Sequence, residues 1–149
     1  MNRLKSMLLG RAAFLAGVLW LSALTVSQAW PSSWWMDVQS VRVADGRVGQ
    51  PVIMYVQREI KRDFTATWGV SVRQLSEGKT FIACAQSAVA DYRRGTDLPE
   101  VVTLGWWSNG RCETLPAGVY VLQTTWQIHG TGLLPAKTVH STSNPFKVS

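Results

Sequence analysis

The stretch Leu115-Pro-Ala-Gly-Val-Tyr-Val-Leu-Gln-Thr-Thr-Trp-Gln-Ile128 decides the fold, because it joins a turn signal to the longest alternating run in the chain. Successive residues of a strand point to opposite faces of a sheet. One face of this run carries Tyr120, Leu122, Thr124, Trp126 and Ile128, and the other carries Val119, Val121, Gln123, Thr125 and Gln127. The pattern predicts a half-buried strand, and Pro116 and Gly118 mark the turn before it.

Shorter alternating or apolar runs occupy the rest of the chain, with turn-forming residues between them. We expect strands at 38–43, 51–60, 64–73, 80–86, 98–107 and 139–149, with a loop at 87–97. No sustained helical period occurs after residue 29. About seven strands of this kind predict an all-β antiparallel sandwich, with a jelly roll or a small barrel as the alternative.

The first 29 residues have the organisation of an export signal. Arg3, Lys5 and Arg11 form a basic start, residues 12–26 are almost wholly apolar, and Ser27-Gln28-Ala29 places small residues at a cleavage site. We expect cleavage after Ala29 and a periplasmic or secreted protein. The alternative is an uncleaved anchor, although about 15 apolar residues are fewer than the roughly 20 that a span needs. The expected domains are a signal peptide at 1–29, a Trp-rich linker at 30–36 and a sandwich at 37–149.

Charge and cysteine content exclude several classes of partner. The chain has a net charge of +6, but without the signal twelve basic residues face nine acidic ones, which gives +3. Because the basic residues are dispersed, we expect no nucleic-acid partner. In an exported chain, Cys84 and Cys112 are expected to form one disulfide. Two separated cysteines with His129 and His140 do not make a metal motif, so we expect no metal and no cofactor.

Catalytic motifs are also missing from the sequence. It contains no G-x-S-x-G and no H-E-x-x-H, and both histidines lie in turn-like or edge contexts where a surface position is expected. Paired carboxylates for glycoside hydrolysis are not visible as a motif, since their separation is spatial. The sequence therefore predicts a protein without enzymatic activity.

Two features resemble an immunoglobulin-like or fibronectin-type-III-like sandwich. Trp68 falls on the third expected strand, where such folds carry a core tryptophan, and Leu115-Pro116 with Gly118 and Tyr120 resembles the tyrosine corner. The resemblance covers about residues 37 to 149 and implies the sandwich fold. The cysteines differ from the antibody pattern, because Cys84 lies on the fourth run rather than the second.

Eight tryptophans are an unusual feature of a chain of this length. We expect Trp68 and Trp126 in the core, and one of Trp106 and Trp107 facing outward, since neighbours in a strand point to opposite faces. Exposed aromatic side chains anchor protein partners or stack on sugar rings. Arg58 interrupts an apolar strand face and is expected at the solvent end of that strand.

Two main functional hypotheses follow. The favoured one is a non-enzymatic exported sandwich module that binds another protein in the cell envelope or outside the cell, because sandwich domains commonly act through edges and loops. The alternative is a carbohydrate-binding module whose contact residues are Trp106, Trp107, Tyr92, Arg93 and Arg94. In a further alternative, the N-terminal segment stays uncleaved and anchors a periplasmic domain, and only then is the membrane a partner.

Overall fold

The computed structural model describes residues 2–132 and 134–149, with the side chains of 11–132 and 134–149. The chain forms two compact units. The first is Met1–Pro31 with Gly130–Pro135, and the second is Ser32–His129 with Ala136–Ser149.

The first unit contains the helix α1 (Asn2–Ala29). Its segment Arg11–Ala29 is 19 residues long and apolar enough to cross a membrane by length and composition, a test that signal sequences near an N-terminus also pass. The hydroxyls of Ser22 and Thr25 donate to carbonyls four residues earlier, so these polar groups are satisfied within the helix. Because a cleaved signal and a membrane anchor both fit such a helix, cleavage after Ala29 and membrane anchoring stay predictions.

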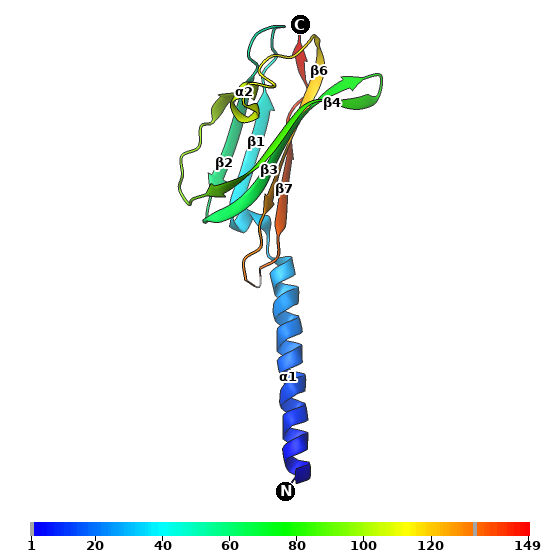
Figure 1. Cartoon of the computed structure of the whole chain (residues 1–149), viewed down its shortest axis with the longest axis vertical. Helices are drawn as coiled ribbons and strands as arrows, with labels where there is room; N and C mark the ends of the chain where they lie inside the picture. The colour runs from blue at the N-terminus through cyan, green and yellow to red at the C-terminus, as the bar shows by residue number, and fades with distance from the viewer. Residues whose placement is uncertain (1, 133) are drawn as a thin grey trace. The chain divides into compact units, whose positions relative to one another are not determined.

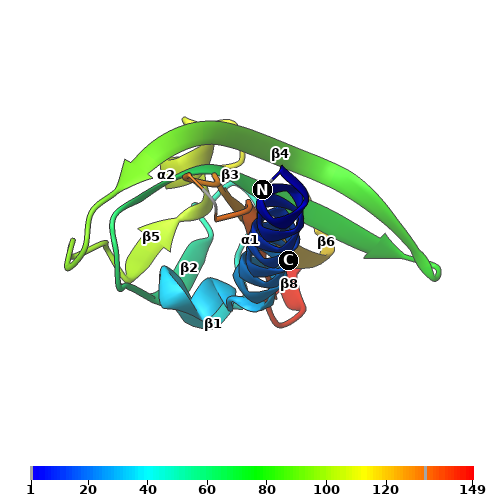
Figure 2. The same ribbon diagram turned by 90° about the horizontal axis from the view of Figure 1, so that it is seen from below.

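The second unit is a sandwich of two antiparallel sheets (Figures 1 and 2). The three-stranded sheet has the order β1-β2-β5, and the five-stranded sheet has the order β4-β3-β6-β7, with β8 also paired to β6. The strands are β1 (Met36–Val43), β2 (Ile53–Ile60), β3 (Phe64–Ser76), β4 (Lys79–Tyr92), β5 (Val101–Thr103), β6 (Gly118–Ile128), β7 (Lys137–Thr142) and β8 (Phe146–Val148). Two short helices complete the unit, η1 (Ser32–Trp34) and α2 (Leu104–Ser108). The all-β antiparallel sandwich is thus confirmed, with eight strands in the part of the chain that the structure describes.

The core lies between the sheets, and β6 supplies its centre. Its five predicted inward residues, Tyr120, Leu122, Thr124, Trp126 and Ile128, are all buried, whereas the alternate residues are half-buried or exposed. β6 pairs with β3 in the middle of the five-stranded sheet, so Val72 of β3 lies beside Leu122 in the same buried layer. The alternation predicted from sequence is confirmed.

Three sequence assignments were wrong at their ends. β4 continues to Tyr92, because its small residues pair with β3 along their whole length, so 87–92 is strand and not loop. The predicted strand 98–107 splits into β5 and α2, and the turn Asn109-Gly110 ends the helix in left-handed geometry (φ 52° and 82°). The predicted strand 139–149 splits into β7 and β8, because Pro145 between them lacks an N–H.

Part of the segment 30–36, expected as a linker, lies within the sandwich unit. The compact sandwich begins at Ser32, and β1 begins at Met36. Trp35 and Met36 are buried, so burial of apolar side chains draws this segment into the domain.

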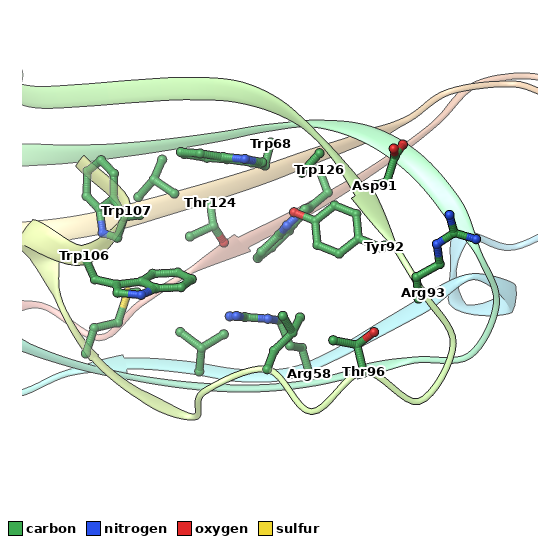
Figure 3. A pocket seen from close by; sticks show the side chains of 15 residues that line it. Arg58, Trp68, Asp91, Tyr92, Arg93, Thr96, Trp106, Trp107, Thr124 and Trp126 are labelled. Carbon is green, nitrogen blue, oxygen red and sulfur yellow. The ribbon is translucent and has the colours of Figure 1, made fainter. Parts of the chain in front are cut away.

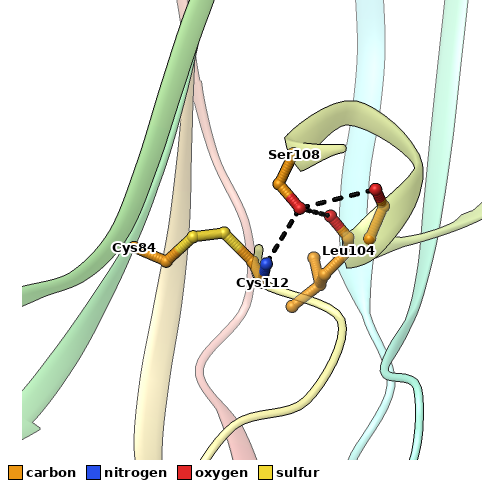
Figure 4. Close-up of a disulfide and its surroundings, with 5 residues drawn as sticks. Cys84, Leu104, Ser108 and Cys112 are labelled. Atoms are coloured by element: carbon orange, nitrogen blue, oxygen red, sulfur yellow. Dashed lines mark hydrogen bonds between the residues drawn. A yellow bond between two sulfur atoms is a disulfide. The ribbon is translucent and has the colours of Figure 1, made fainter. Parts of the chain in front are cut away.

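The disulfide and the tyrosine-corner contact predicted from sequence are both present. Cys84 of β4 and Cys112 form a disulfide with a Cα–Cα distance of 6.0 Å (Figure 4). The Cys112 N–H also donates to Ser108 Oγ at 2.9 Å, which fixes the cysteine against the end of α2. The hydroxyl of Tyr120 donates to the carbonyl oxygen of Pro116 at 2.9 Å, as in a tyrosine corner.

Candidate binding site

A pocket of about 320 Å³ lies inside the sandwich, between β2 and the β3–β4 hairpin. Its wall comes from β2, β3, β4, β6, α2 and the connection from β4 to β5. Figure 3 shows its side chains converging from these elements. The lining residues are Met54, Val56, Arg58, Trp68, Val70, Ala90, Asp91, Tyr92, Arg93, Thr96, Leu98, Trp106, Trp107, Thr124 and Trp126.

Four of the five predicted contact residues line this pocket. Trp106, Trp107, Tyr92 and Arg93 meet there, although Tyr92 and Trp106 are 14 positions apart. Arg94 does not line it, because its backbone N–H donates to Asp63 Oδ1 at 2.7 Å and the residue lies in a separate shallow hollow. The structure therefore unites most of the candidate set and separates Arg94 from it.

The two neighbouring tryptophans differ in exposure, as predicted, but for a different reason. Trp106 is 57% exposed and Trp107 is 7% exposed. Both lie on α2, where a turn of helix and not strand alternation directs one ring outward and the other inward. Trp107 and the edge of Trp106 close one end of the pocket (Figure 3).

The tryptophans expected in the core are also pocket residues. Trp126 is buried, but Trp68 is only half-buried and packs at the margin of the core cluster. Their rings lie on one side of the pocket, opposite the β2 residues (Figure 3). With Tyr92, Trp106 and Trp107 they give the pocket five aromatic side chains.

The position predicted for Arg58 was wrong. Its side chain is half-buried and reaches into the pocket from β2 (Figure 3). Removal from water lowers the pKa of the guanidinium. Within residues 11–132 and 134–149, no carboxylate pairs with it. In the sequence, Arg58 stood out because it interrupts the apolar face of β2. The structure shows that this interruption lies at a pocket and not at a solvated strand end.

Tyr92 is fixed at the other side of the pocket. Its ring stacks on Phe64, with 4.8 Å between centroids and an interplanar angle of 18°. Burial raises the pKa of the Tyr92 hydroxyl, while a hydrogen bond with Trp126 and the nearby Arg58 charge act in the opposite direction. The hydroxyl is therefore a neutral group at physiological pH.

The polar groups that line the pocket differ in how they are hydrogen-bonded. The Trp107 ring N–H is buried and has no partner in the described part of the chain. Thr124 donates its hydroxyl to the Ser141 carbonyl at 3.4 Å. Asp91 is exposed, accepts from Thr65 at 2.6 Å and points away from the centre of the pocket (Figure 3).

No metal-binding group of three His, Cys, Asp or Glu side chains occurs among the described residues. His129 and His140 are exposed and contact the hydroxyls of Thr67 and Thr125 at 2.8 and 3.1 Å. Both histidines are therefore surface residues, as predicted.

A second candidate surface is the β4 edge, which we define as the strand Lys79–Tyr92 on the side away from β3. β4 is the outermost strand of the five-stranded sheet, and in the described part of the chain it pairs with β3 alone. None of its 14 residues is buried. Three large apolar side chains stand out from it, Phe81, Ile82 and Val89, which are 55%, 61% and 63% exposed.

No family model matches the chain, and no curated protein matches it. Among solved structures, the chain is similar to a cycloisomaltooligosaccharide glucanotransferase of Paenibacillus sp. in complex with cycloisomaltoheptaose, at 19% identity and a TM-score of 0.41. The alignment covers 76% of this chain and 14% of that enzyme, so this chain spans a small part of the enzyme's length. A likeness at this level does not bear on function.

Proposed function

We propose that this chain is a non-enzymatic module, exported from the cytoplasm, that binds another protein by pairing an extended segment of that protein with the β4 edge. The observation that carries the proposal is the length and exposure of β4. It has 14 residues where a typical strand has about five or six, and none of them is buried.

The backbone of β4 gives this edge its binding capacity. In an antiparallel sheet, every second residue of an edge strand directs its N–H and C=O away from the neighbouring strand. Soluble proteins usually blunt such edges with charges, proline or a bulge. β4 has charged side chains only at Lys79 and Asp91, near its two ends, and no proline. A bulge at Ala83 interrupts its pairing with β3, so the regular part of the edge runs from Cys84 to Tyr92 and includes Val89. An incoming strand would satisfy these backbone groups, which is the physical basis of strand addition.

Side chains on the β4 edge add apolar contact area. Val89 lies on the outer face of the strand, and Phe81 and Ile82 lie near the turn to β3. A partner strand that pairs with the backbone would cover these side chains as well. Main-chain hydrogen bonds would provide affinity, and the apolar side chains would provide register.

The disulfide supports the location in this proposal. Disulfides persist in oxidising compartments, and the Cys84–Cys112 bond joins β4 to the segment after α2. The apolar helix α1 has the length and position of a signal sequence. A periplasmic or extracellular site of action is consistent with both features.

A capture experiment with an edge variant tests the proposal. The full chain is expressed, and the exported protein is used to capture partners from envelope extracts beside the variants Val89→Lys and Ile53→Lys. Lysine on an edge strand opposes pairing, whereas Ile53 is 40% exposed on β2, which has neighbours on both sides. We expect one partner that is retained by the wild-type and Ile53→Lys proteins and lost with Val89→Lys. Equal retention by all three proteins contradicts binding through β4.

Carbohydrate binding is the alternative function, and it would use the pocket and not the β4 edge. The meeting of Trp106, Trp107 and Tyr92 in one place supports it, because aromatic rings stack on sugars. A glycan array probed with the wild-type protein and a Trp106→Ala variant distinguishes the two functions. A glycan signal that depends on Trp106, together with no protein partner, favours this alternative.

A further inference from the structure

We infer that the interior pocket binds a small aromatic carboxylic acid, whose ring lies among the tryptophans and whose carboxylate pairs with Arg58. This inference goes beyond the proposed function and does not depend on it, since strand addition uses the outer edge of β4 and not the pocket interior.

The charge of Arg58 is the first argument. A guanidinium that is partly removed from water is costly unless an anion pairs with it. Arg58 reaches into the pocket, and no carboxylate among the described residues pairs with it. In contrast Arg93, at the mouth, is exposed and lies 3.7 Å from an Asp63 carboxylate oxygen. The pocket therefore holds one cation whose counter-ion the described protein does not supply.

The donor and acceptor pattern is the second argument. The interior offers the Arg58 guanidinium and the Tyr92 hydroxyl, which accepts from the Trp126 ring N–H and keeps its own proton to donate. The Thr124 hydroxyl already donates to Ser141. A carboxylate only accepts hydrogen bonds, so it matches this set. Sugar hydroxyls both donate and accept, and the carboxylate of Asp91 points out at the mouth. The pattern favours an acid over a neutral sugar.

The size and lining of the pocket select the rest of the ligand. A volume of about 320 Å³ is about twice that of a cavity that holds benzene. Five aromatic side chains surround it, with Met54, Val56, Val70 and Leu98 filling the wall between them. Flat rings stack on or meet such side chains edge to face. A one- or two-ring aromatic body fits both the volume and the walls.

A matched pair of probes tests this assignment. Titration calorimetry compares 2-naphthoate with 2-naphthalenemethanol, which has the same ring system without the charge, on the exported wild-type protein. We expect naphthoate to bind more tightly by about tenfold or more, as for a hydrogen bond to a charged group. In nitrogen-15 NMR spectra, the Trp107 ring N–H signal should shift on addition of naphthoate.

Two arginine variants locate the carboxylate. Arg58→Met keeps an apolar side chain of similar length and should lose the preference for naphthoate. Arg42→Gln, at an exposed position of β1 outside the pocket, should bind within about threefold of wild type. Arg58→Lys, which keeps the charge, should keep part of the preference even if Arg58→Met folds poorly. Equal binding of the two probes, or naphthoate binding that is unchanged in Arg58→Met, overturns the inference. Tighter binding of neutral oligosaccharides than of naphthoate also overturns it.

Discussion

Asn144 binds the backbone of Val43 through both groups of its side-chain amide. The Val43 N–H donates to Asn144 Oδ1 at 3.0 Å, and Asn144 Nδ2 donates to the Val43 carbonyl at 3.0 Å. Val43 ends β1 in one sheet, and Asn144 lies between β7 and β8 of the other. The amide thus joins the two sheets near the edge that lies away from β4 and β5.

Replacing this amide is expected to loosen that edge. Asn144→Ala leaves the backbone N–H and C=O of Val43 without partners, so we expect a loss of about 2 kcal/mol in the free energy of unfolding. Urea denaturation measures it. Gln127→Ala, an exposed position on β6, is the control and should change stability by about 0.5 kcal/mol or less. An Asn144→Ala protein as stable as the control would show that water replaces the amide without cost.

Adjacent substitutions in β6 test its register. Leu122 is fully buried, and Leu122→Ala should cost about 2 to 5 kcal/mol through lost burial and a cavity. Gln123→Ala, on the outer face, should cost about 0.5 kcal/mol or less. Thermal or urea unfolding of both variants provides the comparison. Similar losses in the two variants would contradict the inward and outward assignment of this strand.

Alkaline pH is expected to destabilise the sandwich through two tyrosines. Burial raises the pKa of Tyr92 and of Tyr120 above the ordinary value of 10.0. Because the folded pKa exceeds the unfolded one, the stability linked to the neutral hydroxyls is fully present below about pH 10 and is lost as the pH rises through the folded pKa. Unfolding measured from pH 8 to 12 should therefore show a fall above pH 10. In the Tyr92→Phe variant this fall should be smaller, and an unchanged fall would remove Tyr92 from the explanation.

Export predicts a defined N-terminus. If α1 is a cleaved signal, mass spectrometry of the exported protein should find Trp30 as the first residue, because Ser27 and Ala29 fit the peptidase site. The control is Ala29→Lys, which should block cleavage and leave the chain in the membrane fraction. A full-length wild-type chain in that fraction would instead support the anchored form.

The sequence was most informative where local pattern and tertiary position agree. The buried face of β6, the contact of Tyr120 with Pro116 and the Cys84–Cys112 bond all follow from short-range signals, and all are present. Strand alternation explains the buried face, the turn explains the tyrosine contact, and the redox state of an exported chain explains the disulfide. Each of these can be predicted without knowing the order of the strands in the sheets.

Other features depend on partners that are distant in sequence. The helix Leu104–Ser108 is a local exception, in which the Ser108 hydroxyl donates to the Leu104 carbonyl and accepts from the Cys112 N–H, contacts that an apolar run does not reveal. The strand character of 87–92 comes from pairing with β3. Arg58 faces a pocket because small residues on β4, such as Ala90, leave space opposite β2. Pattern alone predicted the aromatic candidates and Arg93, but it did not place Arg58 in the pocket.

Site-specific photo-crosslinking in intact cells tests the central claim most directly. A photoreactive phenylalanine derivative is placed at Val89 on the β4 edge and, as a control, at Val48, an exposed residue between β1 and β2. We predict a crosslink to one other protein from position 89 and none from position 48, with the crosslinked peptide of the partner in extended conformation. Crosslinks from both positions, or a crosslink at position 89 only to a second copy of this chain, would contradict the proposal that β4 binds a strand of a different protein.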